Sequence, residues 1–475
     1  MSETTALCSI QKSALPHLIL LISPSSLCPA AIDQSIHFTP GLQMSPVKDF
    51  DIAIVGGGIA GLTLAIALNS RSIPVTLYEQ AASFGEIGAG VSFSPNAVQA
   101  MKVCHKGIYE AFETVCTRNL WPSKEKVWFD YVDAYSDVTS DGVLATAFTI
   151  SNSLGQNGLH RAHFLDEAVK LFPKQLVRFG KRLQNITEDG NGRLVMHFDD
   201  GTVAETDAII GCDGIKSRVR QAIVGPDHPS ARPVYTHKYA YRGLIPMEDA
   251  CAAVGEERAQ NACMYMGHDK HILTFPVNHG KTLNLVAFRT TSEDWPDAQR
   301  LTRSGELDEL LQEFKDYGPA VIKLLKLLAP KLNVWAIFDL GYPAPTFYKG
   351  RICISGDAAH ATSPHHGAGA GFCIEDSAML AELLADEQVK SRHELEAVFA
   401  TYDAERRSRA QWLVESSRWI GDCYELRAEG IGNDFTKIEA EIKKRNGIIA
   451  DINIEEMCAR AKDELRKRLS GSCER

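Results

Sequence analysis

The chain has 475 residues, of which 45% are hydrophobic and 23% charged, and its formal net charge is −10 at pH 7. A chain of this length exceeds what one compact core accommodates and predicts two or three globular domains. Lysine and arginine form no dense block, which argues against a nucleic-acid partner. The twelve cysteines contain no CxxC pair, which argues against a secreted disulfide scaffold.

The N-terminal segment, residues 1–47, differs in composition from the rest of the chain. It is rich in serine and proline, and its apolar run, Leu18–Ile22, is too short for a membrane span or a signal-peptide core. We therefore expect residues 1–47 to be a disordered extension, of which residues 1–43 are dispensable. The same features predict a cytoplasmic protein without stable membrane insertion.

Residues 51–61, with the sequence DIAIVGGGIAG, predict a strand that turns directly into a helix. In this pattern Gly56 permits the turn, Gly58 removes a side chain that would block a pyrophosphate, and Gly61 lets helix and strand pack closely. The next apolar run ends at Glu79, where an acid should meet a ribose hydroxyl. The motif predicts a dinucleotide site, and a glycine turn in an unrelated strand–helix–strand unit is the alternative.

Residues 206–220 repeat the strand–turn–helix arrangement and bring Asp213 to a turn. Between about residues 229 and 345 the pattern then changes from alternating strands and helices to consecutive strands. The consecutive strands are expected at residues 235–242, 262–266, 271–277 and 282–288. Because turn residues join them, they predict an antiparallel sheet in a separate domain over residues 229–345.

Residues 351–371 carry the third strand–turn–helix pattern. An apolar strand ends at Asp357, and a glycine-rich helix start that includes Gly369 follows. A carboxylate at a strand end suits a chain of sugar-like hydroxyls, and a helix N-terminus suits a ring that gains negative charge. A flavin has both features, so the segment predicts a flavin site. For Asp357 alone, a helix cap is the alternative role.

The chain from residue 391 onward is predicted to be mainly helical. Its long amphipathic segment, from about Ile454 to Leu469, predicts a packed C-terminal helix, with membrane association or a dimer contact as the alternative. The elements together predict an α/β fold. A Rossmann-like FAD-binding domain with a mostly parallel sheet is expected from two segments, residues 48–228 and 346–390. The antiparallel-sheet substrate domain lies between these segments in the sequence, and a C-terminal helical region is expected at residues 391–475.

The three motifs together resemble those of the class A flavoprotein aromatic hydroxylases. The resemblance spans roughly residues 48–430 and is greatest to salicylate hydroxylase-type enzymes and the related dearomatising phenol hydroxylases. It rests on the glycine motif with Glu79, on Asp213-Gly214 and Gly356-Asp357, and on the stretches 85–90, 95–97, 160–163 and 241–246. Relatives often carry glutamine where this chain has His366, and a smaller residue where it has Phe372.

The resemblance implies a role for individual residues. It places Gly56, Gly58 and Gly61 at the pyrophosphate of FAD, Glu79 at the adenosine ribose, Arg161 near the phosphate and ribityl region, Asp357 at the ribityl chain, and Gly369 and Ala370 against the flavin ring. Ala89 and Gly90, in the 85–90 stretch, are also expected to bind the cofactor. Asp213 is implicated in binding both FAD and NAD(P)H.

Arg242 and Tyr265 are the candidates for handling an aromatic substrate. The planar fork of an arginine holds a carboxylate or phenolate, and a tyrosine hydroxyl bonds the same oxygen or moves its proton. By alternation, Arg242 should share a face of its strand with Ala240, and Tyr241 should point the other way. An interdomain salt bridge is the alternative for Arg242, and packing within the sheet is the alternative for Tyr265.

The resemblance implies an FAD-dependent monooxygenase that uses NAD(P)H and O2 to hydroxylate a phenolic or aromatic-acid substrate through a C4a-hydroperoxyflavin, with loss of CO2 or of aromaticity as possible outcomes. The alternatives are a flavin epoxidase or halogenase, or a non-catalytic nucleotide- or lipid-binding carrier. We expect a monomer or homodimer. The histidine pairs at 160/163 and 365/366 lack acidic or thiolate partners nearby in the sequence, so we expect no metal site.

Overall fold

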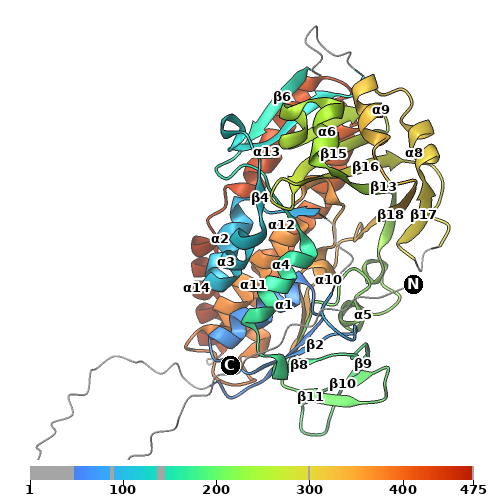
Figure 1. Cartoon of the computed structure of the whole chain (residues 1–475). Helices are drawn as coiled ribbons and strands as arrows, with labels where there is room; N and C mark the ends of the chain where they lie inside the picture. Colours follow the sequence, from blue (N-terminus) through green and yellow to red (C-terminus); the bar gives the residue numbers. More distant parts are fainter. Residues whose placement is uncertain (1–47, 86–89, 136–144, 298–299, 473–475) are drawn as a thin grey trace, which may run out of the picture. The chain divides into compact units, whose positions relative to one another are not determined.

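The computed structural model describes residues 48–85, 90–135, 145–297 and 300–472, so the expected extension at residues 1–47 lies outside the described residues. A six-stranded sheet with the order β19-β20-β12-β1-β2-β8 forms the first part of the fold (Figure 1). Its strands from β20 to β8 pair in parallel, and β19 is antiparallel to β20. The strands are β1 (Ile52–Val55), β2 (Val75–Tyr78), β8 (Val177–Arg178), β12 (Ala208–Gly211), β19 (Tyr348–Lys349) and β20 (Ile352–Ile354).

The central strands β1 and β12 consist of small and branched apolar residues that are buried throughout, as expected for a parallel sheet covered on both faces. The helix α11 packs against α1 and α2, and the C-terminal helices α12 (Leu395–Tyr424) and α14 (Ile454–Ser472) pack against α11 in turn. The helices of this part are α1 (Ile59–Ser70), α2 (Pro95–Cys104), α3 (Lys106–Val115), α4 (Arg161–Ala168), α5 (Arg218–Val224), α10 (Asp357–His360) and α11 (Gly369–Ala385).

An eight-stranded sheet with the order β17-β18-β13-β16-β15-β14-β5-β6 forms the second part. Its neighbours pair antiparallel except β14 and β5, which are parallel. The strands are β5 (Val127–Asp133), β6 (Thr146–Ser151), β13 (Val234–Pro246), β14 (Cys263–Gly267), β15 (Lys270–Val277), β16 (Thr282–Thr290), β17 (Thr302–Glu306) and β18 (Lys331–Asp339). The expected mixed fold, with a parallel and an antiparallel sheet, is therefore confirmed.

The eight-stranded sheet is covered on both faces. Apolar residues of short helices form one core with it, and residues from the C-terminal end of α12 and from α13 (Phe435–Ala450) form another. The short helices are α6 (Met247–Val254), α7 (Glu256–Gln260), α8 (Leu307–Glu313) and α9 (Pro319–Leu325). Because β5 and β6 belong to this sheet, it includes strands from outside residues 229–345, and the domain limits given above stay a prediction.

Two smaller sheets and three C-terminal helices complete the described chain. The sheets are β11-β10-β9 and β3-β7-β4. Their strands are β9 (Leu183–Glu188), β10 (Leu194–Phe198), β11 (Val203–Thr206), β3 (Gly90–Ser92), β7 (Asn157–His160) and β4 (Thr117–Arg118), and the helices are α12 (Leu395–Tyr424), α13 (Phe435–Ala450) and α14 (Ile454–Ser472). The expected C-terminal helix, α14, packs with buried Met457, Ala461 and Leu465 against α11 and α2. Within the described ranges no helix has the length and apolarity that a membrane crossing needs.

Candidate active site

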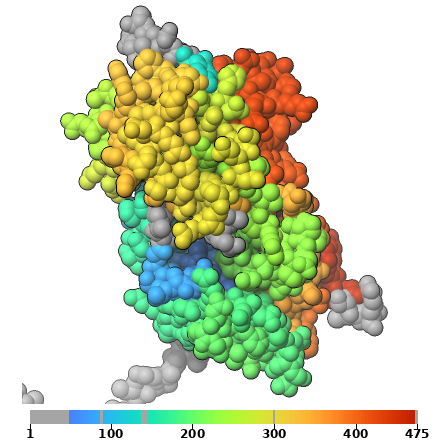
Figure 2. Space-filling model, turned by 90° about the vertical axis from the view of Figure 1, so that its right-hand side faces the viewer, coloured from blue at the N-terminus to red at the C-terminus, as the bar shows by residue number. Residues whose placement is uncertain are grey.

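A cavity of about 1310 Å³ opens at the carboxyl ends of β1, β2 and β12 and continues along β13–β16 of the eight-stranded sheet. On the face shown in Figure 2, the surface is hollowed between the blue segment and the yellow segment above it. Ligands of open parallel sheets bind at the carboxyl ends of the strands. The cavity is therefore the place where the sequence motifs should meet.

The glycine turn between β1 and α1 has no room for side chains at two of its positions. Gly56 has a φ of +108°, and a Cβ atom there would lie 2.3 Å from the carbonyl oxygen of Cys212. A Cβ atom at Gly61 would lie 1.9 Å from the carbonyl oxygen of Gly56. Gly56 lines the cavity, whereas Gly61 is not among the lining residues and serves the packing of helix on strand.

Gly58 differs from these two glycines because its backbone borders open space. Among the described residues, a Cβ atom there would contact Nη2 of Arg161, at 3.6 Å. That is an ordinary van der Waals separation, so the fold itself tolerates a side chain at this position. The glycine leaves the N-terminus of the twelve-residue helix α1 open toward the cavity, where free N–H groups attract a phosphate.

Glu79 lies at the end of β2 and holds the same turn from the other side. Its Oε2 accepts a hydrogen bond from the backbone N–H of Gly57 (2.6 Å), and its Oε1 accepts one from Ala81 (2.7 Å). The half-buried carboxylate also lines the cavity, so it has oxygen lone pairs left for a ligand hydroxyl.

Replacing Glu79 with alanine is expected to weaken FAD binding roughly 10- to 100-fold, because hydrogen bonds to a charged group contribute about 1.5–3 kcal/mol. The dissociation constant can be measured from the quenching of flavin fluorescence as apoprotein is added. The matched control is Glu429→Ala, at an exposed residue beyond α12, which should bind FAD normally. An unchanged constant in Glu79→Ala would remove Glu79 from the cofactor site.

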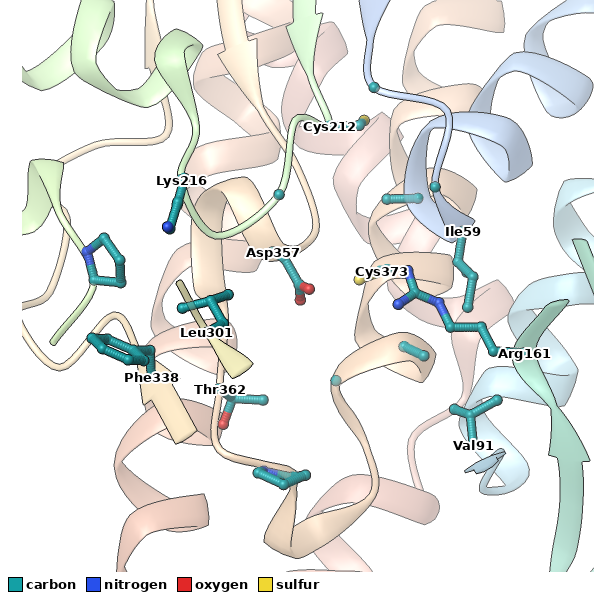
Figure 3. A pocket seen from close by; sticks show the side chains of 18 of the residues that line it. Ile59, Val91, Arg161, Cys212, Lys216, Leu301, Phe338, Asp357, Thr362 and Cys373 are labelled. Carbon is teal, nitrogen blue, oxygen red and sulfur yellow. The ribbon is translucent and has the colours of Figure 1, made fainter. Parts of the chain in front are cut away.

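Asp357 and Arg161 lie on opposite sides of the cavity and point toward one another (Figure 3). Asp357 is the first residue of α10 and is exposed, while Arg161 is the first residue of α4. A carboxylate and a guanidinium that face each other across a cavity offer an acceptor for hydroxyls and a cation for a phosphate. This pairing suits a ribityl chain that ends in a pyrophosphate.

Asp213 caps the helix α5 with one carboxylate oxygen. Its Oδ2 accepts hydrogen bonds from the backbone N–H groups of Arg218 (2.6 Å) and Val219 (3.2 Å). Its buried Oδ1 has no hydrogen-bond partner within the described residues, and burial raises the pKa of the carboxyl group. Because unpaired buried oxygens are costly, a polar ligand group in the cavity that Asp213 lines would satisfy this atom.

The start of α11 forms a further stretch of the cavity wall. Gly369 and Ala370 line it, and Gly367 ahead of them has the left-handed φ of +65°. Gly90 lies on β3, where a Cβ atom would come within 2.8 Å of the Phe275 ring. Ala89, the other residue expected here, lies outside the described residues.

The two expected substrate residues are separated by the sheet. Arg242 on β13 lines the cavity, its guanidinium lies 4.9 Å from the centre of the Trp335 ring, and its buried Nε has no partner within the described residues. Tyr265 on β14 is not among the lining residues, because its neighbour Met264 faces the cavity and Tyr265 points into the core under α6–α9. The structure therefore places Tyr265 within the packing of the sheet, which is the alternative role given for it above.

Residues 49–417 match the FAD binding domain family. The chain is 46% identical over 429 residues to the FAD-dependent monooxygenase pigN of Monascus ruber, covering 88% of this chain and 97% of that one. The chain belongs to this family of FAD-dependent monooxygenases. The monooxygenase is also 39% identical over 447 residues to salicylate hydroxylase asL1 of Sarocladium schorii (90% and 93% covered).

Among solved structures, the monooxygenase superposes on a salicylate hydroxylase substrate complex with a TM-score of 0.78, at 32% identity, covering 87% of this chain and 98% of that one. The predicted cofactor, FAD, and the predicted class of enzyme are thereby confirmed, and NAD(P)H is the co-substrate typical of the family. The glycine turn, the facing charges of Asp357 and Arg161, and the unpaired oxygen of Asp213 all fit FAD.

Both unusual residues of the monooxygenase near the ring pocket have partners in the fold. His366 hydrogen-bonds Ser416 (Nε2 to Oγ, 2.8 Å) and lines the cavity. Phe372 is fully buried, with the guanidinium of Arg409 4.5 Å from the centre of its ring. The larger phenyl group is therefore accommodated beneath the arginines of α12 and does not enter the cavity.

Most residues of the cavity wall beside Arg242 lie outside the sequence motifs and were not predicted as site residues. Aromatic and sulfur side chains of the eight-stranded sheet line this end of the cavity, together with one tyrosine and one histidine from the C-terminal part: Trp128, Phe129, Tyr131, Met264, Phe275, Phe288, His365 and Tyr424. The signal available in the sequence was period-2 alternation, which groups Phe129 with Tyr131 on one face of β5. Alternation alone does not reveal which face meets the cofactor.

Proposed function

We propose that the monooxygenase hydroxylates a phenol or an aromatic acid that binds at the aromatic end of the cavity, with its oxygen substituent on Arg242. The observation that carries this proposal is a half-buried, cationic Arg242 in the same cavity as the glycine motif, beside a wall of aromatic rings. Aromatic rings pack well against a planar substrate. The guanidinium fork matches a carboxylate or phenolate.

The charge on Arg242 supports this role. Burial, with a smaller contribution from the nearby Arg161, lowers the pKa of Arg242 to about 10, so the side chain stays cationic at neutral pH. A half-buried cation with no carboxylate partner among the described residues is costly, and an anionic substrate would offset that cost. The named relative asL1, a salicylate hydroxylase, acts on a molecule that carries both a carboxylate and a phenol.

In this proposal the residues of the chain bind, orient and exclude water. FAD, when bound, supplies the chemistry that activates O2. The ribityl chain of FAD would be held by Asp357, and its ring by Gly369 and Ala370. Its dinucleotide part would be held by Gly56, Gly58, Glu79, Gly90, Arg161 and Asp213. The aromatic wall keeps water from the reacting face, and Arg242 stabilises negative charge on the substrate oxygen.

Replacing Arg242 with alanine is expected to lower the kcat/KM of substrate-stimulated NAD(P)H oxidation about 10- to 100-fold, while FAD stays bound, because one charge-assisted hydrogen-bonding group is lost. Salicylates, hydroxybenzoates and alkyl resorcinols serve as probes, and product mass separates loss of CO2 from simple oxygen insertion. Arg242→Lys keeps the charge but not the planar fork, so its kcat/KM should lie between those of the unchanged enzyme and of Arg242→Ala. If Arg242→Ala keeps the kinetics of the unchanged enzyme, Arg242 does not bind the substrate.

A further inference from the structure

Three cationic side chains line an exposed part of the cavity wall, and we call them the basic rim. They are Lys216, Arg218 and Arg232. Arg218 donates a hydrogen bond from Nη1 to the side-chain oxygen of Gln221 (3.1 Å), and within the described residues neither its guanidinium nor that of Arg232 forms an ion pair with a carboxylate. A cavity lined by charges of one sign concentrates ligands of the opposite sign, so the basic rim favours an anion.

The basic rim is held in place by Arg220, a fully buried side chain of α5. Its guanidinium donates hydrogen bonds to three backbone carbonyl oxygens, those of Ile215 (2.6 Å), Ala231 (3.2 Å) and Ala358 (2.8 Å). Each accepting residue is the chain neighbour of a residue that lines the cavity, namely Lys216, Arg232 and Asp357. One buried side chain therefore fixes the backbone of the basic rim beside Asp357 before a ligand binds, which lowers the cost of binding.

The basic rim is separate from the place that the cavity offers to the pyrophosphate of FAD. That group is expected at the N-terminus of α1, where Nη2 of Arg161 lies 3.6 Å from the Cβ position of Gly58. In Figure 3, Lys216 lies on one side of Asp357 and Arg161 lies on the other. A second phosphate-bearing ligand could therefore meet the basic rim while FAD occupies its own site.

Four carboxylates of the described residues line the cavity, and each of them already has a role. Glu79 and Asp213 accept backbone hydrogen bonds, and Asp357 is proposed for the ribityl chain of FAD. The fourth, Asp199, lies 3.7 Å from the guanidinium of Arg182. A site for NADH presents a carboxylate to the ribose 2′-hydroxyl, whereas a site for NADPH presents arginine to the 2′-phosphate. The basic rim matches the second pattern.

We propose that Arg218 and Arg232, with Lys216 beside them, bind the 2′-phosphate of the nicotinamide co-substrate, so that the enzyme uses NADPH in preference to NADH. A phosphate monoester carries a charge of about −1.5 to −2 at pH 7, and the planar fork of an arginine bonds two of its oxygens at once. The inference rests on the proposed function, from which it takes the use of NAD(P)H, and it requires no particular aromatic substrate.

Titration calorimetry of the FAD-loaded protein tests the contact with two probes, adenosine 2′,5′-bisphosphate and adenosine 5′-monophosphate, which differ in the 2′-phosphate alone. The bisphosphate should bind about 100-fold more tightly, because its additional phosphate gains charge-assisted hydrogen bonds. Arg218→Ala and Arg232→Ala should each weaken the bisphosphate about tenfold and change the monophosphate less than about twofold. Arg460→Ala is the matched control, since it removes the same charge from an exposed position of α14 outside the cavity, and it should change neither constant.

The kinetics should show the same preference. The kcat/KM for NADPH should exceed that for NADH about 100-fold, and the ratio should fall about tenfold in Arg218→Ala and in Arg232→Ala. A bisphosphate that binds no more tightly than the monophosphate, an equal weakening of both probes in the variants, or a loss of bound FAD from either variant would overturn the inference. The titration contains no aromatic substrate, so a failure of every aromatic probe to stimulate NAD(P)H oxidation counts against the proposed function alone.

Discussion

Replacing Arg406 with alanine is expected to lower the free energy of unfolding by about 3–5 kcal/mol, because it removes a buried cation shared by two buried carboxylates. Among the described residues, Glu375 then keeps only Arg409 as an ion-pair partner, and Asp376 keeps only His360. Arg406 of α12 is fully buried, and it contacts Glu375 Oε2 through Nη1 (2.5 Å) and Asp376 Oδ1 through Nε (2.7 Å). Asp376 in turn accepts a hydrogen bond from the N–H of Gly356 (3.0 Å), which precedes Asp357. The variant should therefore also release FAD more readily.

Urea unfolding, followed by tryptophan fluorescence and by flavin release, measures this effect. Arg407→Ala is the matched control, because Arg407 is partly exposed and pairs with Asp403 on its own helix, a type of pair that contributes only about 0–1 kcal/mol. Equal losses in the two variants would contradict a special role for the buried cluster.

The same cluster sets a direction for the pH dependence of stability. Burial would raise the pKa of Asp376, but the charges of His360 and Arg406 outweigh it and hold the pKa low. A carboxyl group whose pKa is depressed in the folded state contributes stability above its unfolded pKa of about 3.9, and that stability is lost as the pH falls further. In Arg406→Ala the folded-state pKa of Asp376 should rise toward its unfolded value, so less stability should be lost as the pH falls below about 3.9.

The glycine motif could be predicted from the sequence because its requirements are local and steric. At Gly56 and Gly61 the backbone itself occupies the space that a Cβ atom would need. Such positions accept glycine alone, and their spacing therefore identifies the turn, the helix and the ligand together. The fold class and the cofactor followed from three such turns.

The side of a strand that meets the cavity could not be predicted in the same way. Every residue of β14 is buried, because the eight-stranded sheet is covered on both faces. Alternation separates Met264 from Tyr265 but does not say which of them faces the cofactor. On β13 the pattern was informative, since Arg242 lines the cavity and Tyr241 is fully buried in the opposite core.

The packing of His365, His271 and Glu425 beside the cavity could not be predicted from the sequence, for a different reason. His365, His271 and Glu425 come from three elements that only the tertiary fold brings together. No local spacing links a turn before α11 with the middle of one sheet and the end of α12. The same holds for β5 and β14, which pair in parallel although they are distant in sequence.

Replacing Gly58 with alanine is expected to weaken FAD binding about 100-fold or more, equal to about 3 kcal/mol, while the apoprotein keeps its stability. The protein has room for the added methyl group, whose contact is Arg161 Nη2 at 3.6 Å. A loss of binding must therefore come from the methyl group meeting the cofactor, whose pyrophosphate approaches the backbone closely at this glycine.

Two further variants make the experiment decisive. In Gly61→Ala the methyl group would meet the carbonyl oxygen of Gly56 at 1.9 Å, so this protein should lose stability even without FAD. Gly190→Ala, at a hairpin position with no atom within 4 Å, should change neither property. Thermal unfolding of each apoprotein and flavin-fluorescence titration separate the two effects. A Gly58→Ala protein that binds FAD as tightly as the unchanged chain would mean that the pyrophosphate does not lie on the N-terminus of α1, and the orientation of the whole cofactor in the cavity would have to be reversed.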